Sequence, residues 1–134
     1  ATAAQGGDRA IPAWGAEPAL ADDTARSLAA GERVRIGPSD TIADGARADI
    51  PGEVTFPVLQ ARAAGVVRVP EEAIARAVRL LVTRAKLVVE PTGVLAAAAA
   101  FEDLLPPELE RVGVILSGGN VDPTMLARIL VDES

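Results

Sequence analysis

Four consecutive residues, Ser117 to Asn120, combine a hydroxyl, two glycines and an amide directly after an apolar run that starts at Val112. Pro123 and an apolar-periodic segment at 125–131 follow, so the pattern predicts a buried strand, a glycine turn and a helix start. Ligands of open parallel sheets bind at the carboxyl ends of strands, and glycine permits close backbone approach. Ser117 would offer its hydroxyl there. An ordinary strand-to-helix turn has the same pattern, so both interpretations stay open.

A second group with potential chemistry is acidic: Glu17, Asp22 and Asp23 lie within seven residues. Hard cations such as magnesium and calcium prefer oxygen ligands, so these carboxylates form a candidate cation site. Acidic side chains also complement the positive end of a helix, and Pro18 suits the first turn of a helix. Spacing alone favours the helix-start interpretation, because acidic first turns are frequent.

The composition narrows the classes of protein to consider. The chain has 134 residues, which predicts one domain, and its hydrophobic fraction of 49% supplies a core of small aliphatic side chains. Cysteine and histidine are both absent, which excludes disulfides, thiolate metal sites and a histidine base. The net charge of −6 argues against nucleic acid. No apolar run approaches the ~20 residues of a membrane span, and we expect a cytoplasmic protein without a membrane partner.

Secondary-structure signals alternate along the chain. The first residues, 1–5, resemble the end of a helix that Gly6, Gly7 and Asp8 terminate, which suggests a piece of a longer polypeptide. Residues 31–51 have no clear period and are predicted to form a functional or mobile loop. Apolar periods and turn signals predict strands at 10–16, 66–69 and 112–117, and helices at 18–30, 52–64, 73–87, 94–101 and 125–131. Such alternation predicts an α/β fold with parallel strands.

Several stretches, taken in order, resemble the carboxyl-terminal part of the serine racemase and threonine (serine, 3-hydroxyaspartate) dehydratase group. These are pyridoxal-phosphate enzymes of the tryptophan-synthase-β-like fold (fold type II), an open, mostly parallel sheet with helices on both faces. The resemblance covers essentially the whole chain, here as a partial domain. Each motif alone is weak, and their order gives the specificity. The stretches are 17–23, 41–45, 51–57, 67–72, 86–93 and 116–122.

The resemblance implies residues that contact the cofactor, pyridoxal 5'-phosphate. Ser117 would hydrogen-bond the pyridine nitrogen, and Gly118 and Asn120 belong to the same turn. Gly45 would approach the substituted edge of the ring, and Glu90 would lie close to the ring plane. A neutral hydroxyl does not hold the nitrogen protonated as an aspartate would. The ring is then a weaker electron sink, which suits β-elimination.

The resemblance also implies a divalent cation, magnesium, calcium or manganese. Its ligands would be the Glu17 carboxylate, the main-chain carbonyl of Ala21 and the Asp23 carboxylate, which reverses the preference for a simple helix start. The cation would order the following loop and a dimer surface rather than perform chemistry. In relatives that bind a nucleotide effector, residues at the positions of Lys86 and Asn120 contribute.

The departures from the family pattern concern the catalytic machinery. The family's Schiff-base lysine lies in an amino-terminal serine-x-lysine motif that this chain lacks, and its glycine-rich phosphate loop would precede Ala1. Lys86 is the only lysine, and its place at the end of a predicted helix favours a helix-end cation over catalysis. Covalent catalysis needs the nucleophilic amine, so we expect no catalytic residue and no turnover in this chain alone.

Two interpretations of function remain. In the first, the chain is the carboxyl-terminal segment of a pyridoxal-phosphate-dependent threonine/serine ammonia-lyase or serine racemase. Its partners would be a small amino-acid substrate, the missing amino-terminal half of the same enzyme and a second copy in a homodimer. In the second, it is a non-catalytic α/β binding module that retains the family scaffold.

Overall fold

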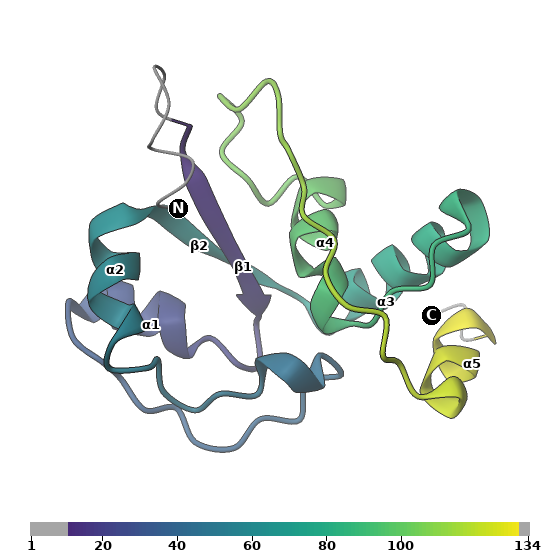
Figure 1. Cartoon of the computed structure of the whole chain (residues 1–134), viewed down its shortest axis with the longest axis horizontal. Helices are drawn as coiled ribbons and strands as arrows, with labels where there is room; N and C mark the ends of the chain where they lie inside the picture. Colours follow the sequence, from purple (N-terminus) through teal and green to yellow (C-terminus); the bar gives the residue numbers. More distant parts are fainter. Residues whose placement is uncertain (1–10, 132–134) are drawn as a thin grey trace.

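The computed structural model describes residues 11–131, and the predicted helix end at 1–5 with its terminating residues lies outside this range. Two parallel strands form a sheet, with α1 and α2 on one side and α4 on the other (Figure 1). No helix among residues 11–131 is long and apolar enough to cross a membrane. In chain order the elements are β1 (Ala13–Pro18), α1 (Asp23–Ala30), the 3-10 turn η2 (Asp44–Ala46), α2 (Thr55–Arg62), β2 (Ala63–Val69), α3 (Glu71–Leu80), the π-helical turn η3 (Leu81–Ala85), the 3-10 turn η4 (Thr92–Val94), α4 (Leu95–Phe101) and α5 (Pro123–Val131).

The second strand of the sheet starts earlier than predicted. β2 begins at Ala63, so the helix predicted to reach residue 64 ends at Arg62 and passes into the strand without a loop. The reason is tertiary, because Ala63 pairs with Ala13 on β1. At the next register position the indole of Trp14 lies over Gly65, where a Cβ atom would collide with the ring. Strand pairing therefore outweighs the helical preference of these residues.

The first strand extends further than predicted. β1 continues to Pro18, where the pattern had placed the start of a helix, and α1 begins only at Asp23. Pro18 pairs with Val69 of β2, and the N–H of Ala19 donates a hydrogen bond of 2.8 Å to the carbonyl of Val69. Pairing with β2 therefore keeps this segment extended and delays the helix.

The core lies between the sheet, α3 and α4. Ile74 and Val78 of α3 and Val69 of β2 are fully buried, in agreement with the apolar stripe predicted for the helix at 73–87. The helix predicted at 94–101 is confirmed as α4, which is rich in alanine, and its small side chains allow close packing. Its buried alanines are Ala97, Ala98 and Ala99.

The helix that starts with α3 ends at Lys86. The backbone runs through η3 and reverses at Lys86, whose φ of 61° lies in the left-handed region. The Lys86 ammonium donates a hydrogen bond of 2.6 Å to the carbonyl of Thr83. A cation that satisfies a carbonyl of the last turn is the expected role of lysine at a helix end, so the helix-end interpretation of Lys86 is confirmed.

The predicted buried strand at 112–117 is wrong as a description of this structure. The segment pairs with no strand among residues 11–131, and its side chains are exposed, with Ile115 at 80%. The apolar, β-branched pattern indicates residues that can be buried on both faces of a sheet. Burial also needs neighbouring strands, and the described part of the chain supplies only β1 and β2, which pair with each other.

The last helix is confirmed and starts slightly earlier than predicted. α5 begins at Pro123. Proline lacks an N–H, but the N–H groups of the first helical turn have no acceptor within the helix, so no hydrogen bond is lost there. The carboxylate of Asp122 accepts a hydrogen bond of 2.9 Å from the N–H of Met125 and completes the helix start. The guanidinium of Arg79 on α3 donates two hydrogen bonds, 3.0 and 2.8 Å long, to the carbonyl of Ile129. These bonds attach α5 to α3.

Candidate cofactor site

The predicted glycine turn at 117–120 lies against the Glu-Pro-Thr-Gly stretch that begins at Glu90. The N–H of Ser117 donates to the carbonyl of Gly93 at 3.2 Å, and the N–H of Glu90 donates to the carbonyl of Gly118 at 3.4 Å. The N–H of Asn120 donates to the Glu90 carboxylate at 3.0 Å. Two segments that are far apart in sequence are thereby joined by three hydrogen bonds.

Glycine is required on both sides of this contact. A Cβ atom at Gly93 would collide with the carbonyl of Ser117, so only glycine lets the two backbones approach. Gly118 has a φ of +76°, in the left-handed region, and a Cβ there would collide with the Glu90 carboxylate. Gly118, which was predicted to approach a ligand, and Gly93, which was given no role, therefore both allow the two segments of the chain to pack closely against each other.

Gly45 is joined to the same cluster through a residue that the sequence interpretation had left without a role. The hydroxyl of Thr92 accepts a hydrogen bond of 3.0 Å from the N–H of Gly45. Thr92 lies two residues after Glu90, in the motif that binds the turn. The structure thus brings together all five residues predicted to contact the cofactor: Gly45, Glu90, Ser117, Gly118 and Asn120. Thr92 and Gly93, which connect them, were overlooked because only the glutamate of that motif was given a function.

The donor set of this turn is compatible with the pyridine ring of pyridoxal phosphate. Ser117 is exposed, and its hydroxyl has no hydrogen-bond partner among residues 11–131. A hydroxyl can donate to an unprotonated pyridine nitrogen without adding charge. The Glu90 carboxylate is occupied by the N–H of Asn120, so its present contacts hold the turn.

The predicted cation ligands lie at the opposite end of the chain, where β1 meets α1. Glu17 is 8% exposed and Asp23 is 4% exposed. Ala21, which lies between them in the sequence, is fully buried. The Glu17 carboxylate accepts hydrogen bonds from the N–H groups of Ala25, at 2.7 Å, and Thr24, at 3.3 Å. It therefore complements the amino-terminal turn of α1, as the helix-start interpretation predicted.

The third carboxylate of the acidic group has other partners. Asp22 forms ion pairs with Arg26 of α1 at 2.7 Å and with Arg68 of β2 at 2.8 Å, which ties the start of the helix to the sheet. Among residues 11–131 no group of three or more acidic side chains is gathered for a metal ion. That finding concerns groups of three side chains, whereas the predicted ligand set has two carboxylates and one main-chain carbonyl. The cation site therefore remains a prediction.

Burial is the main electrostatic effect on the two candidate ligands. It raises the pKa of Glu17 above its ordinary value, and the hydrogen bond from Ala25 acts in the opposite direction while the charge of Asp23 adds to the increase. Burial likewise raises the pKa of Asp23, and the charges of Asp49 and Asp22 add to that increase. Two partly desolvated carboxylates with like charges nearby form a place where a cation would be stabilised.

Comparison with known proteins identifies the class first. The family model described as pyridoxal-phosphate dependent enzyme matches residues 1–118, and the chain belongs to this family. Among solved structures, a threonine deaminase from T.th. superimposes with a TM-score of 0.83 at 46% identity, covering 90% of this chain and 41% of that chain. Maize serine racemase superimposes with a TM-score of 0.84 at 37% identity, covering 94% of this chain and 40% of that chain. These neighbours have the tryptophan-synthase-β-like fold, which confirms the predicted fold class.

Curated relatives agree with the structural neighbours. Serine racemase of Dictyostelium discoideum is 38% identical over 124 residues, which are 90% of this chain and 38% of that protein. L-threo-3-hydroxyaspartate ammonia-lyase of Pseudomonas sp is 37% identical over 117 residues, which are 87% of this chain and 37% of that protein. The chain therefore spans about two fifths of the length of these relatives.

Proposed function

We propose that this chain is the carboxyl-terminal segment of a pyridoxal-phosphate-dependent ammonia-lyase or racemase. The intact enzyme would act on small hydroxy-amino acids such as serine, threonine or 3-hydroxyaspartate, by β-elimination of water or by racemisation. The observation that carries the proposal is the convergence of Gly45, Glu90 and the 117–120 turn on one surface. The names of the relatives support an enzyme over a non-catalytic binding module.

In this proposal the turn supplies one wall of the cofactor cleft. The bound cofactor supplies an electron sink for the carbon that carries the substrate's amino group. Ser117 donates its hydroxyl proton in a hydrogen bond to the pyridine nitrogen, and Gly118 and Asn120 present the main chain beside it. Glu90 keeps the turn in place through the N–H of Asn120. Gly45, which lacks a side chain, allows the ring edge to approach the backbone.

The proposal includes a divalent cation held by Glu17, the carbonyl of Ala21 and Asp23. Both carboxylates are buried and have raised pKa values, so a bound magnesium, calcium or manganese ion would offset their desolvation. The ion would organise the loop after β1 and, through it, the surface of a homodimer. It has no role in the chemical step. A cytoplasmic location is part of the same proposal.

The exposed apolar segment supports the proposal that an amino-terminal half completes the fold. Val112, Val114, Ile115 and Leu116 form an apolar, mostly β-branched run that solvent contacts. Strands from the missing half would pair with this segment and bury it. The same half would bring the lysine that holds the cofactor and the phosphate loop. This chain alone is therefore expected to self-associate through its apolar surface and to show no turnover.

The test compares Ser117 variants in the intact enzyme. Ser117→Ala removes the hydroxyl, and we expect about tenfold weaker cofactor retention, or ~1.4 kcal/mol, as for the loss of one hydrogen bond. Ser117→Thr is the matched control, because it keeps a hydroxyl and should retain most of the affinity. Cofactor is titrated by absorbance, and ammonia release from serine and threonine is assayed in parallel. Equal cofactor affinity and activity in the parent and Ser117→Ala would contradict the proposal.

A second arm tests the missing half. Residues 1–134 alone should give no ammonia, and addition of an amino-terminal half that carries the lysine and phosphate loop should restore cofactor absorbance. Turnover by the isolated chain would require a catalytic base among its own residues and would overturn the segment interpretation.

A further inference from the structure

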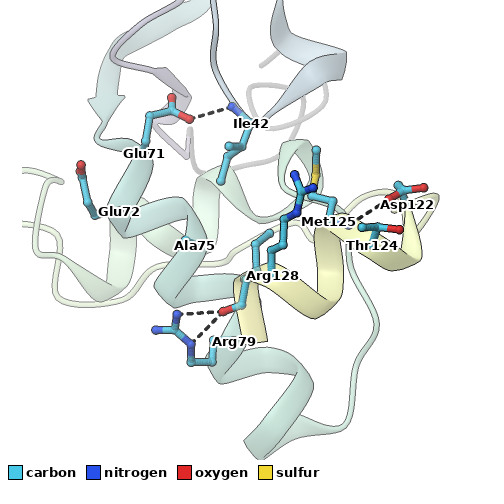
Figure 2. Close-up of a pocket in the computed structure, with 10 residues that line it drawn as sticks. Ile42, Glu71, Glu72, Ala75, Arg79, Asp122, Thr124, Met125 and Arg128 are labelled. Atoms are coloured by element: carbon cyan, nitrogen blue, oxygen red, sulfur yellow. Dashed lines mark hydrogen bonds between the residues drawn. The ribbon is translucent and has the colours of Figure 1, made fainter. Parts of the chain in front are cut away.

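The cavity at the end of β1, which the start of α1 and the loop at 46–52 also line, is acidic. Its volume is about 330 Å³, and its charged lining side chains among residues 11–131 are Glu17 and Asp23 alone. In the cavity between α3 and α5, by contrast, acidic side chains such as Glu71 and basic ones such as Arg128 line the same space (Figure 2). The predicted cation ligands therefore line a space that no basic side chain of the described residues enters.

Two arginines lie close to this acidic cavity, and both are bound by a carboxylate that does not line it. The two oxygens of Asp22 are each 2.7–2.8 Å from a guanidinium nitrogen, one from Arg26 of α1 and the other from Arg68 of β2. Asp22 is itself buried and lies directly before Asp23 in the sequence. Its side chain therefore holds two positive charges beside the cavity without bringing them into it.

The loop on the other side of the cavity repeats this arrangement. Arg33 donates a hydrogen bond of 2.7 Å to the carbonyl of Pro51, which lines the cavity, but its ion pair of 3.0 Å is with Glu53, which does not. Arg35 forms an ion pair with Asp49, which is also absent from the lining. Each of these arginines is thus neutralised by a carboxylate outside the cavity, and Glu17 and Asp23 keep their charges.

Arg68 is the arginine best placed to reach a cation ligand. It is the register partner of Glu17 across the sheet, and neighbouring strands lie about 4.8 Å apart. Both side chains extend to the start of α1, where Glu17 accepts a hydrogen bond from the N–H of Ala25 and Arg68 binds Asp22. Opposite charges at paired positions attract each other, so Arg68 and Glu17 would form an ion pair if Asp22 did not hold the guanidinium.

We propose that Asp22 is a positioning residue for the divalent cation. It holds Arg68 and Arg26 outside the cavity and thereby preserves the two negative charges of Glu17 and Asp23 for the ion. The inference rests on the cation site proposed above and adds to it a residue that does not touch the ion. A guanidinium paired with Glu17 would occupy a ligand oxygen and repel a doubly charged cation, and both effects weaken binding.

The inference is tested by thermal unfolding of the 134-residue chain over a series of magnesium concentrations, with sodium chloride at matched ionic strength as the control for screening. The concentration dependence of the melting temperature gives the magnesium dissociation constant of each variant. Asp22→Asn keeps the shape of the side chain and removes its charge. Its dissociation constant should rise at least about tenfold, because the released Arg68 then pairs with Glu17.

The double variant Asp22→Asn/Arg68→Gln distinguishes this role from a merely structural one. It removes the competing guanidinium together with the carboxylate that held it, so it should recover most of the lost magnesium affinity. Arg68→Gln alone should bind magnesium as tightly as the parent or more tightly. If Asp22 only braced the backbone at 21–23, Arg68→Gln would weaken binding and the double variant would bind no better than Asp22→Asn.

The matched control is Glu102→Gln, which releases Arg76 from an ion pair of 2.8 Å outside this cavity and should leave the magnesium affinity unchanged. Circular dichroism without magnesium checks that the variants fold. If Asp22→Asn does not fold, Arg68→Gln decides: weaker magnesium binding overturns the inference, and equal or tighter binding supports it.

Two failures of different meaning are distinguishable in this experiment. A parent chain that responds to magnesium, together with an Asp22→Asn variant of equal affinity or a double variant without recovery, overturns the role of Asp22 and leaves the cation site standing. A parent chain that does not respond to magnesium removes the proposed cation site and the role of Asp22 with it.

Discussion

The strand β2 and the segment 112–117 have similar sequences and opposite environments. Both are short, apolar and rich in valine, yet Val69 at the end of β2 is fully buried whereas Ile115 is 80% exposed. β2 pairs with β1 along its length and is covered by helices, while 112–117 has no strand beside it among residues 11–131. An apolar pattern therefore indicates a capacity for burial, and the neighbouring elements determine whether it is used.

The residues that follow the 112–117 segment and those at the end of β1 also differ in how they are held in place. The turn after the exposed segment is held by three hydrogen bonds to the 90–93 stretch, so the candidate cofactor residues are organised even though the segment before them is not covered. At the end of β1, which pairs with β2, the buried carboxylates of Glu17 and Asp23 have raised pKa values, and in our proposal a cation compensates them. The first end is organised by hydrogen bonds to a segment distant in sequence, whereas our proposal adds a cation to the protein contacts of the second.

The largest expected effect concerns the contact that organises the 117–120 turn. Gly93→Ala places a Cβ against the carbonyl of Ser117, and we expect a loss of about 3 kcal/mol of unfolding free energy, the upper end for overpacking. Gly113→Ala, on the exposed segment, is the matched control, because a Cβ there meets nothing within 4 Å. Urea unfolding followed by circular dichroism measures both. Equal stability of the two variants would show that the 93–117 contact contributes little.

The next prediction compares the two strand-like segments directly. Val69→Ala removes two buried methyl groups and should cost ~2 kcal/mol, whereas Ile115→Ala should cost less than ~0.5 kcal/mol in this chain. In the intact enzyme the Ile115→Ala cost should rise to ~2 kcal/mol or more, because the proposed amino-terminal half buries this side chain. Urea midpoints of both variants in both forms provide the measurement. An unchanged Ile115→Ala cost in the intact enzyme would argue against burial of the segment.

Sequence patterns predicted the features that depend on residues close in the chain. The stripe of Ile74 and Val78, the alanine helix α4 and the helix-end role of Lys86 follow from period and capping, and each is confirmed. The family resemblance, carried by motifs in order, predicted the fold class that the neighbours confirm.

What escaped prediction depends on partners distant in sequence. Ala63 joins β2 instead of α2 because Ala13 lies opposite, and no local signal reports that pairing. The contacts of Thr92 with Gly45 and of Gly93 with Ser117 required the folded chain. The exposure of the 112–117 segment was unpredictable for the same reason, since the pattern does not state which strands are present.

A smaller effect is expected at the acidic end of β1. If Glu17 and Asp23 bind a divalent cation, magnesium at about ten times its dissociation constant should stabilise the chain by about 1.4 kcal/mol. Asp23→Asn should abolish this gain, while Asp40→Asn, a surface carboxylate outside the proposed ligand set, should retain it. Thermal unfolding with and without chelator is the measurement. A parent chain that is indifferent to magnesium, calcium and manganese would leave the helix-start role as sufficient.

The same carboxylates predict a pH dependence without cation. Their folded-state pKa values lie above the ordinary values of 4.5 for Glu17 and 3.8 for Asp23, so the native state retains protons that the unfolded state releases. The contribution of these carboxyl groups to the unfolding free energy is therefore greatest at low pH. It is lost as pH rises from their ordinary pKa values through the raised folded-state pKa values. Glu17→Gln should flatten this slope relative to the parent in urea titrations at a series of pH values. An unchanged slope would show that other groups dominate.

The smallest effect is expected at Lys86, which ends the helix between the buried core and the candidate site. Its left-handed φ of 61° is unfavourable for a residue with a Cβ, and its ammonium contributes one exposed hydrogen bond to Thr83. Lys86→Gly removes both the backbone strain and the hydrogen bond. Because these two effects have opposite signs, the unfolding free energy of the variant should lie within about 0.5–1 kcal/mol of the parent value. Lys86→Ala keeps the strain and loses the bond, and should be the less stable of the two. Urea unfolding ranks the variants, and cofactor titration of the intact enzyme with Lys86→Gly should match the parent. Loss of covalently bound cofactor in Lys86→Gly would instead give Lys86 the catalytic role that its position at a helix end argues against.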